Sequence, residues 1–139
     1  MRMLAVDPGE KRLGLALSDP SGTIANPLMV LKHVSHLIDA ATIADIARQN
    51  QVERIIVGQS LDDEGEATPQ SRRAVHLAEA IHNQSGLPVE LWEESYSTQA
   101  ARQAQIALGV PRRKRRGHLD ELAATFILQT YLDAHAEQP

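Results

Sequence analysis

The feature that most constrains this fold is a change in the spacing of its apolar residues. The N-terminal part has three short apolar runs, at residues 3–6, 14–18 and 27–31, separated by turns that contain Gly and Pro. Short apolar runs joined by such turns predict three antiparallel strands. From Ser35, a good N-cap, to about Asn50, apolar residues instead recur every three or four positions, which predicts an amphipathic helix.

The rest of the chain alternates strands with helices. Strands are predicted at 55–58 and 89–92, with a helix between them that Pro69 begins and Gly86 ends. Two more helices are expected, from Ser97 or Thr98 to Gly109 and from Leu119 to Ala136. Strands joined through helices pair in parallel, whereas hairpins pair antiparallel. We therefore expect an α/β fold: one domain over residues 1–139, with a mixed five-stranded sheet of three antiparallel and then parallel strands, flanked by helices.

The amino-acid composition limits the metal ligands and cofactors that the chain can use. The chain has no Cys, which removes disulfides, thiolate nucleophiles and iron–sulfur clusters and fits a reducing compartment. Any metal must then be held by carboxylates or His. The N-terminal apolar stretch, Met3 to Val6, is far too short for a signal peptide or a membrane span. A cytoplasmic protein without membrane contact is expected.

The basic residues are unevenly distributed. The net charge is −4, yet five of the 14 basic residues are consecutive: Arg112, Arg113, Lys114, Arg115 and Arg116. We predict that this basic run forms a loop that binds nucleic-acid phosphates, together with Lys11 and Arg12 of the first turn. A loop that is merely solvated is the alternative. Aromatic residues are only 3% of the chain, so stacking on bases is not expected and binding should rely on shape and backbone.

Acidic residues stand where strands and a helix meet loops. Asp7 ends the first strand, Glu93 and Glu94 end the fifth, and Asp120 opens the last helix. The carboxyl ends of strands in such sheets are where ligands bind. Clustered carboxylates repel each other unless a cation lies between them, and oxygen ligands suit Mg²⁺ or Mn²⁺. Two such ions would catalyse phosphodiester hydrolysis.

Each acid also has a plainer explanation. Asp7, before Pro and Gly, is a common turn residue, and Asp120 is favoured by the dipole of its helix. Glu93 and Glu94 could form a solvated strand end. His33 and His36 have a spacing that suits a metal, but no partner completes a site, so surface or capping roles are favoured.

Several motifs together resemble a known family. They are Asp7-Pro8-Gly9-Glu10-Lys11-Arg12-Leu13-Gly14, Ser18-Asp19-Pro20, Val57-Gly58, Gly65, Pro69-Gln70 and Asp120-Glu121-Leu122-Ala123-Ala124. In this order they resemble the YqgF (RuvX) family of RNase H-like proteins, described both as pre-16S rRNA nucleases and as Holliday junction resolvases. The resemblance implies an RNase H-like nuclease domain. It also implies catalytic, metal-binding acids at Asp7, Glu94 and Asp120, with Mg²⁺ or Mn²⁺ as cofactor.

Two positions depart from the family pattern, and three functions remain open. The family usually has Asp-Glu-Arg where this chain has Glu93-Glu94-Ser95, and Pro where it has Ser60. The preferred hypothesis is a metal-dependent endonuclease that processes the 5′ end of pre-16S rRNA in ribosome biogenesis. The alternatives are a resolvase of four-way DNA and a non-catalytic RNA-binding module, which the Ser95 departure would favour. Both a monomer and a homodimer fit the sequence.

Overall fold

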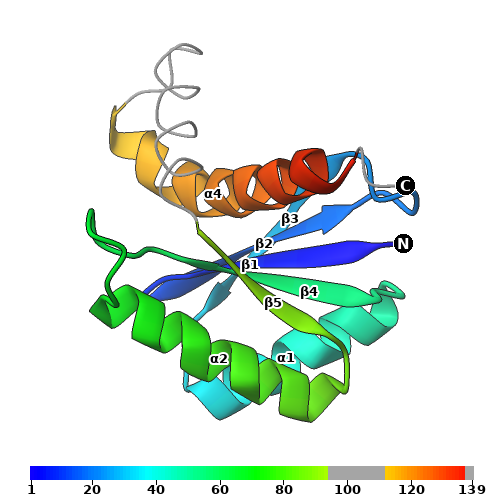
Figure 1. The fold of residues 1–139 in the computed structure, drawn as a ribbon, viewed down its shortest axis with the longest axis horizontal. Helices are drawn as coiled ribbons and strands as arrows, with labels where there is room; N and C mark the ends of the chain where they lie inside the picture. Colours follow the sequence, from blue (N-terminus) through cyan, green and yellow to red (C-terminus); the bar gives the residue numbers. More distant parts are fainter. Residues whose placement is uncertain (94–111, 137–139) are drawn as a thin grey trace.

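A five-stranded sheet with helices on both faces forms the centre of the protein (Figure 1). The computed structural model describes residues 1–93 and 112–136, with the backbone alone for 112–121. The strands are β1 (Met3–Pro8), β2 (Arg12–Ser18), β3 (Ala25–Lys32), β4 (Arg54–Gln59) and β5 (Val89–Glu93). The described helices are α1 (His36–Gln49), α2 (Pro69–Ser85) and α4 (Arg112–His135). None of these helices is long and apolar enough to cross a membrane.

The strand order confirms the predicted mixed sheet. It is β3-β2-β1-β4-β5, with antiparallel pairing among β1, β2 and β3 and parallel pairing of β1 with β4 and of β4 with β5. Because β1, β4 and β5 run in the same direction, they end at one edge of the sheet. We call this the carboxyl edge, and the opposite one the amino edge.

The ends of α1 and α2 lie where the sequence predicts them. The Ser35 hydroxyl accepts a hydrogen bond from the Ile38 backbone N–H and caps α1. Thr68 and Ser71 form a reciprocal capping box at the start of α2. Gly86 ends α2 in the left-handed conformation, with φ of 72°, which glycine adopts without steric cost.

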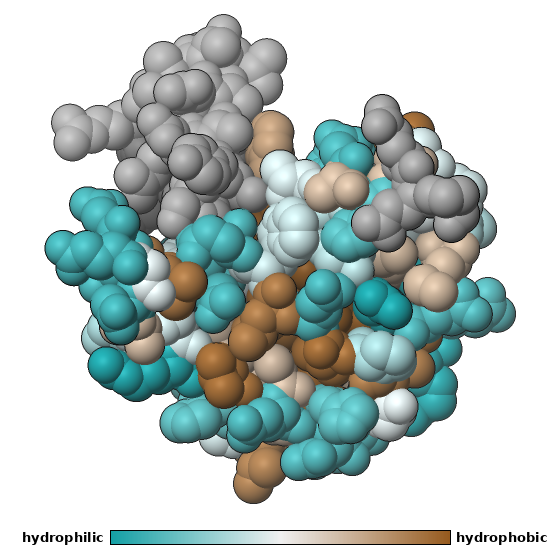
Figure 2. Space-filling view, in the orientation of Figure 1, coloured by the Kyte–Doolittle hydropathy of each residue, from teal (hydrophilic) through white to brown (hydrophobic). Residues whose placement is uncertain are grey.

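The alternation of side chains along each strand divides the core into two. Leu4 and Val6 pack with α1 and α2, whereas Ala5 between them packs beneath α4. We call these sides of the sheet the α1/α2 face and the α4 face. The space-filling view shows apolar surface gathered around β5 and α2, with hydrophilic residues around it (Figure 2).

The predicted loop for the basic run is wrong. Residues 112–116 form the first turn and more of α4, which begins seven residues before the predicted start at Leu119. Arg and Lys are good helix formers, and consecutive residues of a helix point in different directions, so five adjacent cations do not prevent a helix. The helix predicted from Ser97 or Thr98 to Gly109 lies outside the described residues, as does Glu94.

Candidate active site at the carboxyl edge

Asp7 lies in β1 at the carboxyl edge. It is partly buried, and its pairing partner on the neighbouring strand β2 is Gly14. Because side chains alternate along a strand, Asp7 lies on the α4 face, as Ala5 does. The turn that follows is closed by a hydrogen bond of 2.9 Å from the Gly9 N–H to the Arg12 carbonyl. A Cβ atom on Gly9 would lie 2.4 Å from that oxygen, so only glycine fits. Asp7 is therefore a strand residue, and the turn is built by the residues after it.

The Glu93 side chain lies on the α1/α2 face, away from Asp7, and a hydrogen bond holds it there. Its carboxylate accepts a hydrogen bond of 3.1 Å from the Leu61 N–H in the loop between β4 and α2. Trp92, one residue earlier, instead faces α4 and donates to the Thr130 hydroxyl at 3.0 Å. Of the two acids predicted at this strand end, Glu93 supports a loop. Glu94 lies outside the described residues.

The departure at Ser60 has a visible consequence in the same loop. The Ser60 N–H donates to the Gln70 side-chain oxygen at 2.5 Å, and the Thr68 hydroxyl donates to the Ser60 carbonyl at 2.5 Å. The Pro that is usual in the family has no N–H and could not make the first of these bonds. Ser60 therefore gives the loop an additional attachment to the start of α2.

Helix α4 runs antiparallel to β1. At its C-terminal end, the Gln129 side chain accepts from the Ala25 N–H at 2.9 Å, and the Tyr131 hydroxyl accepts from Arg54 at 3.1 Å. Ala25 and Arg54 both lie at the amino edge, so the first turns of α4 extend toward the carboxyl edge (Figure 1). Asp120 lies in this part of the helix, four residues before the buried Ala124. Its side chain is outside the described part of the structure.

Three convergent ligands are not visible among the described side chains. Within residues 1–93 and 122–136, no three His, Asp or Glu side chains are grouped to hold a metal ion. Two of the three predicted ligands, Glu94 and Asp120, fall outside these ranges. Their convergence with Asp7 therefore stays a prediction.

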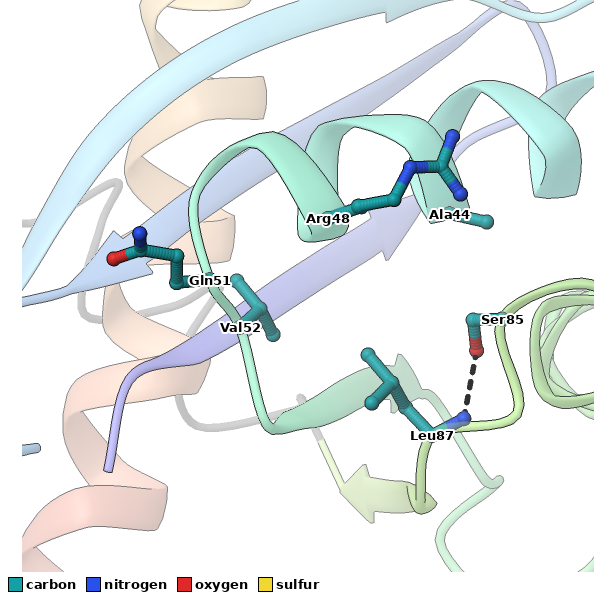
Figure 3. Close-up of a pocket in the computed structure, with 6 residues that line it drawn as sticks. All are labelled: Ala44, Arg48, Gln51, Val52, Ser85 and Leu87. Carbon is teal, nitrogen blue, oxygen red and sulfur yellow. Dashed lines mark hydrogen bonds between the residues drawn. The ribbon is translucent and has the colours of Figure 1, made fainter.

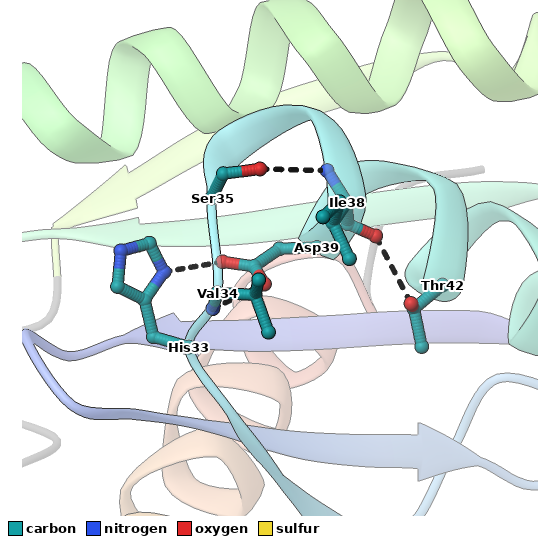
Figure 4. A network of polar contacts seen from close by, with 6 residues as sticks. All are labelled: His33, Val34, Ser35, Ile38, Asp39 and Thr42. Atoms are coloured by element: carbon teal, nitrogen blue, oxygen red, sulfur yellow. Dashed lines mark hydrogen bonds and ion pairs between the residues drawn. The ribbon is translucent and has the colours of Figure 1, made fainter.

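His33 has the structural role that its sequence context favours. Its Nδ1 atom lies 2.5 Å from a carboxylate oxygen of the buried Asp39, whose other oxygen accepts from the Val34 N–H at 3.0 Å (Figure 4). This network joins the end of β3 to the first turn of α1. The acid that partners His33 was missed from the sequence, because it lies six residues away on the following helix.

Asp19, part of a family motif, is also structural. It lies in the turn between β2 and β3 at the amino edge, and its carboxylate accepts from the Ile24 and Thr23 N–H groups at 2.9 and 2.8 Å. The hydrogen bond from Ile24, with those from Ser21 and Thr23, holds the pKa of Asp19 well below its usual value. Not every acid of the family motifs belongs to the carboxyl edge.

A pocket at the amino edge is chemically different. It has a volume of about 330 Å³ and lies between the ends of α1 and α2 (Figure 3). Its described lining residues are Ala44, Arg48, Gln51, Val52, Ser85 and Leu87. The one charged residue among these, Arg48, pairs with Asp45. This lining has no carboxylate and does not resemble a hydrolytic site.

The fold is of the RNase H-like class, and resolvases of the RuvC type share it. It superposes on RuvC of Thermus thermophilus in complex with a Holliday junction substrate with a TM-score of 0.58, at 17% identity over 99% of this chain and 96% of that one. The fowlpox virus resolvase, in complex with Holliday junction DNA, gives a TM-score of 0.57 at 13% identity, over 96% and 98% of the two chains. At these identities the likeness concerns the fold.

The chain belongs to the RuvX family, described as Holliday junction resolvase, whose model matches residues 1–134. A relative from Syntrophus aciditrophicus, named "Putative pre-16S rRNA nuclease", is 40% identical over 138 residues, covering 99% of this chain and 92% of that protein. One of the same name from Symbiobacterium thermophilum is 40% identical over 139 residues, covering 100% and 96%. The predicted family and RNase H-like fold are confirmed, and the family's chemistry is hydrolysis of phosphodiester bonds.

Proposed function

We propose that this protein is a divalent-metal-dependent endonuclease that processes the 5′ end of pre-16S rRNA. The observation that carries the proposal is the position of Asp7, a partly buried carboxylate at the carboxyl edge, on the face covered by the helix that contains Asp120. The names of relatives at 40% identity supply the substrate. Their alignment over nearly the whole chain supports the same role here.

Asp7, Glu94 and Asp120 are proposed as the catalytic metal ligands. Carboxylate oxygens are the donors that Mg²⁺ and Mn²⁺ prefer, so this set fits the proposed cofactor. Glu93 faces away from Asp7, and side chains alternate along a strand, which favours Glu94 as the residue on the side of Asp7. Residues four apart lie on one side of a helix, so Asp120 precedes the sheet-facing Ala124 by one turn. Held by these three carboxylates, a pair of divalent ions would supply activation of the attacking water and stabilisation of the leaving oxygen.

The basic run is proposed to hold the substrate, together with Lys11 and Arg12. Five cations at the start of α4 add to the partial positive charge of the helix N-terminus, an arrangement that is unfavourable without an anion nearby. The phosphate backbone of RNA relieves that repulsion. The start of α4, Lys11 and the first residue of β2, Arg12, all lie toward the carboxyl edge, so a bound strand would pass Asp7.

The decisive experiment presents pure protein with precursor rRNA, single strands, duplexes and four-way DNA junctions. Each substrate is incubated with Mn²⁺, Mg²⁺ or EDTA, and products are resolved on denaturing gels. We expect metal-dependent cleavage of the precursor rRNA near its 5′ end, abolished by EDTA.

Two other outcomes would replace the proposal. Preferential cutting of junctions would favour a resolvase, which the family description and the fold likeness to RuvC support as the second candidate. Binding of RNA without cleavage under any metal condition would favour the non-catalytic RNA-binding module.

A further inference from the structure

A cationic pocket lies beside the carboxyl edge, where β2 begins and β3 ends. Its volume is about 540 Å³, and its described lining residues are Lys11, Arg12, Val30 and Lys32. Lys32 is distant from Lys11 and Arg12 in sequence, and the antiparallel pairing of Arg12 with Lys32 brings the three cations together.

The strand register places this pocket on the face of Asp7. Asp7 pairs with Gly14 on β2, and Gly14 pairs with Val30 on β3, so the three residues form one row across the sheet. Leu13 and Leu15 are in the core of the α1/α2 face, so Gly14 and Arg12 are on the α4 face. Strands lie about 4.8 Å apart, which puts Val30 about 10 Å from Asp7. Gly14, between them, contributes no side chain to obstruct a ligand.

Two acids near this end of the sheet have partners outside the pocket. Glu10 lies 3.9 Å from Arg73 of α2, and the Asp39 carboxylate contacts His33 and the Val34 N–H. Lys11 and Lys32 are exposed and make no ion pair within the described part of the chain. Their ammonium groups therefore remain available to an anion.

We propose that this pocket binds a backbone phosphate of the substrate strand a few nucleotides from the bond that is cut, with Lys32 as a substrate-positioning residue. This inference rests on the proposed nuclease function and deepens it. About 10 Å corresponds to about three nucleotides at the 3.4 Å rise of a stacked strand, and to fewer in an extended one. A strand that crosses Asp7 would thus place a neighbouring phosphate over Val30, between Arg12 and Lys32.

Lysine footprinting tests the contact directly, because the chain has only three lysines, Lys11, Lys32 and Lys114. The full-length protein is acetylated with an N-hydroxysuccinimide ester in EDTA, with or without a 12-nucleotide single-stranded RNA, and each site is quantified by mass spectrometry. We expect RNA to slow acetylation of Lys11 and Lys32 several-fold. The α-amino group of Met1, which donates to the Pro20 carbonyl at the amino edge, is the internal control and should react at the same rate.

Salt dependence of binding gives the second measurement. Each phosphate contact to a single strand contributes about −0.7 to the log–log slope of affinity against salt. Lys32→Gln should make the slope shallower by about 0.7, and Lys32→Arg should keep it. Arg72→Gln is the matched control, since it removes the same charge from an exposed site on α2, across the sheet from α4. It should leave the slope unchanged.

These results separate the pocket from the nuclease. An unchanged slope in Lys32→Gln together with equal acetylation of Lys32 with and without RNA overturns the pocket, as does a wild-type protein that binds no nucleic acid. Because the acetylation is done in EDTA, where no metal-dependent cleavage occurs, protection of Lys32 supports the pocket even if the protein cuts nothing. If metal-dependent cleavage requires Asp7 while both binding assays are indifferent to Lys32, the nuclease stands and the pocket is removed.

Discussion

The two faces of the sheet are built from different residues. On the α1/α2 face the strands contribute large aliphatic side chains that are fully buried in one cluster with residues of the two helices, Leu4, Leu15, Ile55 and Val57 among them. On the α4 face β1 and β2 contribute the small residues Ala5 and Ala16, beside Ile56 of β4 and Trp92 of β5. Small residues on a sheet allow a helix to lie close, whereas branched residues bury more apolar area.

The α4 face also contains part-buried polar contacts. The Tyr131 hydroxyl donates to Glu90 at 2.6 Å and accepts from Arg54 at 3.1 Å, and burial raises the pKa of Tyr131 above its ordinary value. Charged side chains of the sheet, Glu90 and Arg54, thus find a hydrogen-bond partner on α4. The difference teaches that the strands bury more large aliphatic side chains on the α1/α2 face, while the α4 face contains Asp7 and contacts that involve charged groups.

The largest expected effect is on activity and comes from Asp7→Asn. If Asp7 binds metal, cleavage should fall about a thousandfold or more, which corresponds to about 4 kcal/mol in the barrier. The fold should remain intact or become slightly more stable, because one member of a repelling acidic cluster is neutralised. Cleavage rates with Mn²⁺ and thermal melting curves check both parts.

Glu93→Gln and Glu94→Gln provide the control for that result. Glu94→Gln should lose activity as Asp7→Asn does, whereas Glu93→Gln should retain most of it, because Glu93 supports the Leu61 loop. Equal losses in the two variants would show that strand alternation does not extend to residue 94. Wild-type activity in Asp7→Asn would remove Asp7 from the site.

Ile55→Ala on the α1/α2 face should lower stability and leave activity unchanged, which is the opposite of Asp7→Asn. Ile55 is fully buried, and truncation of such a side chain costs about 2–5 kcal/mol of unfolding free energy. Urea unfolding measures the loss. Cleavage per folded molecule should not change, and a large loss of activity in the folded variant would contradict the division between the two faces.

A smaller effect is expected when the basic run is replaced by five glutamines. If all five cations contact phosphates, they contribute about −3.5 to the salt slope for single-stranded RNA, or about a hundredfold in affinity between 50 and 200 mM salt. The variant should lose most of this slope, similarly for unrelated sequences, because backbone contacts do not distinguish bases. Glutamine is a good helix former, so α4 should persist by circular dichroism. An unchanged slope would mean that the run is only solvated.

The smallest effect is expected for Tyr131→Phe. Loss of the hydroxyl should cost about 1 kcal/mol near neutral pH, because Glu90 and Arg54 lose a hydrogen-bond partner. Burial raises the pKa of Tyr131, so its contribution is fully present below the unfolded value near pH 10 and is lost as pH rises through the folded value. Urea unfolding between pH 7 and 11 should therefore show the wild type losing stability faster than the variant above about pH 10. Parallel curves would exclude this linkage.

Local chemistry explains what the sequence by itself determined. Ser35, Pro69 and Gly86 marked helix ends correctly, because capping depends on the conformations and hydrogen bonds of a few adjacent residues. The strands and their mixed pairing followed from apolar runs and the connections between them. Asp7 could be selected because it ends the first strand and belongs to a family motif. Its metal-binding role remains a prediction.

Tertiary structure decided whatever depended on residues distant in the chain. Strand alternation and the loop at Leu61 determined that Glu93 faces away from Asp7. The pairing of β2 with β3 placed Lys32 beside Arg12, and no local pattern indicates that contact. The basic run was misjudged for a related reason. Local repulsion suggested a loop, but a helix anchored to the sheet by its distant C-terminal half extends through cations with good helix propensity. Pairing and packing between segments add energies that a local pattern does not contain.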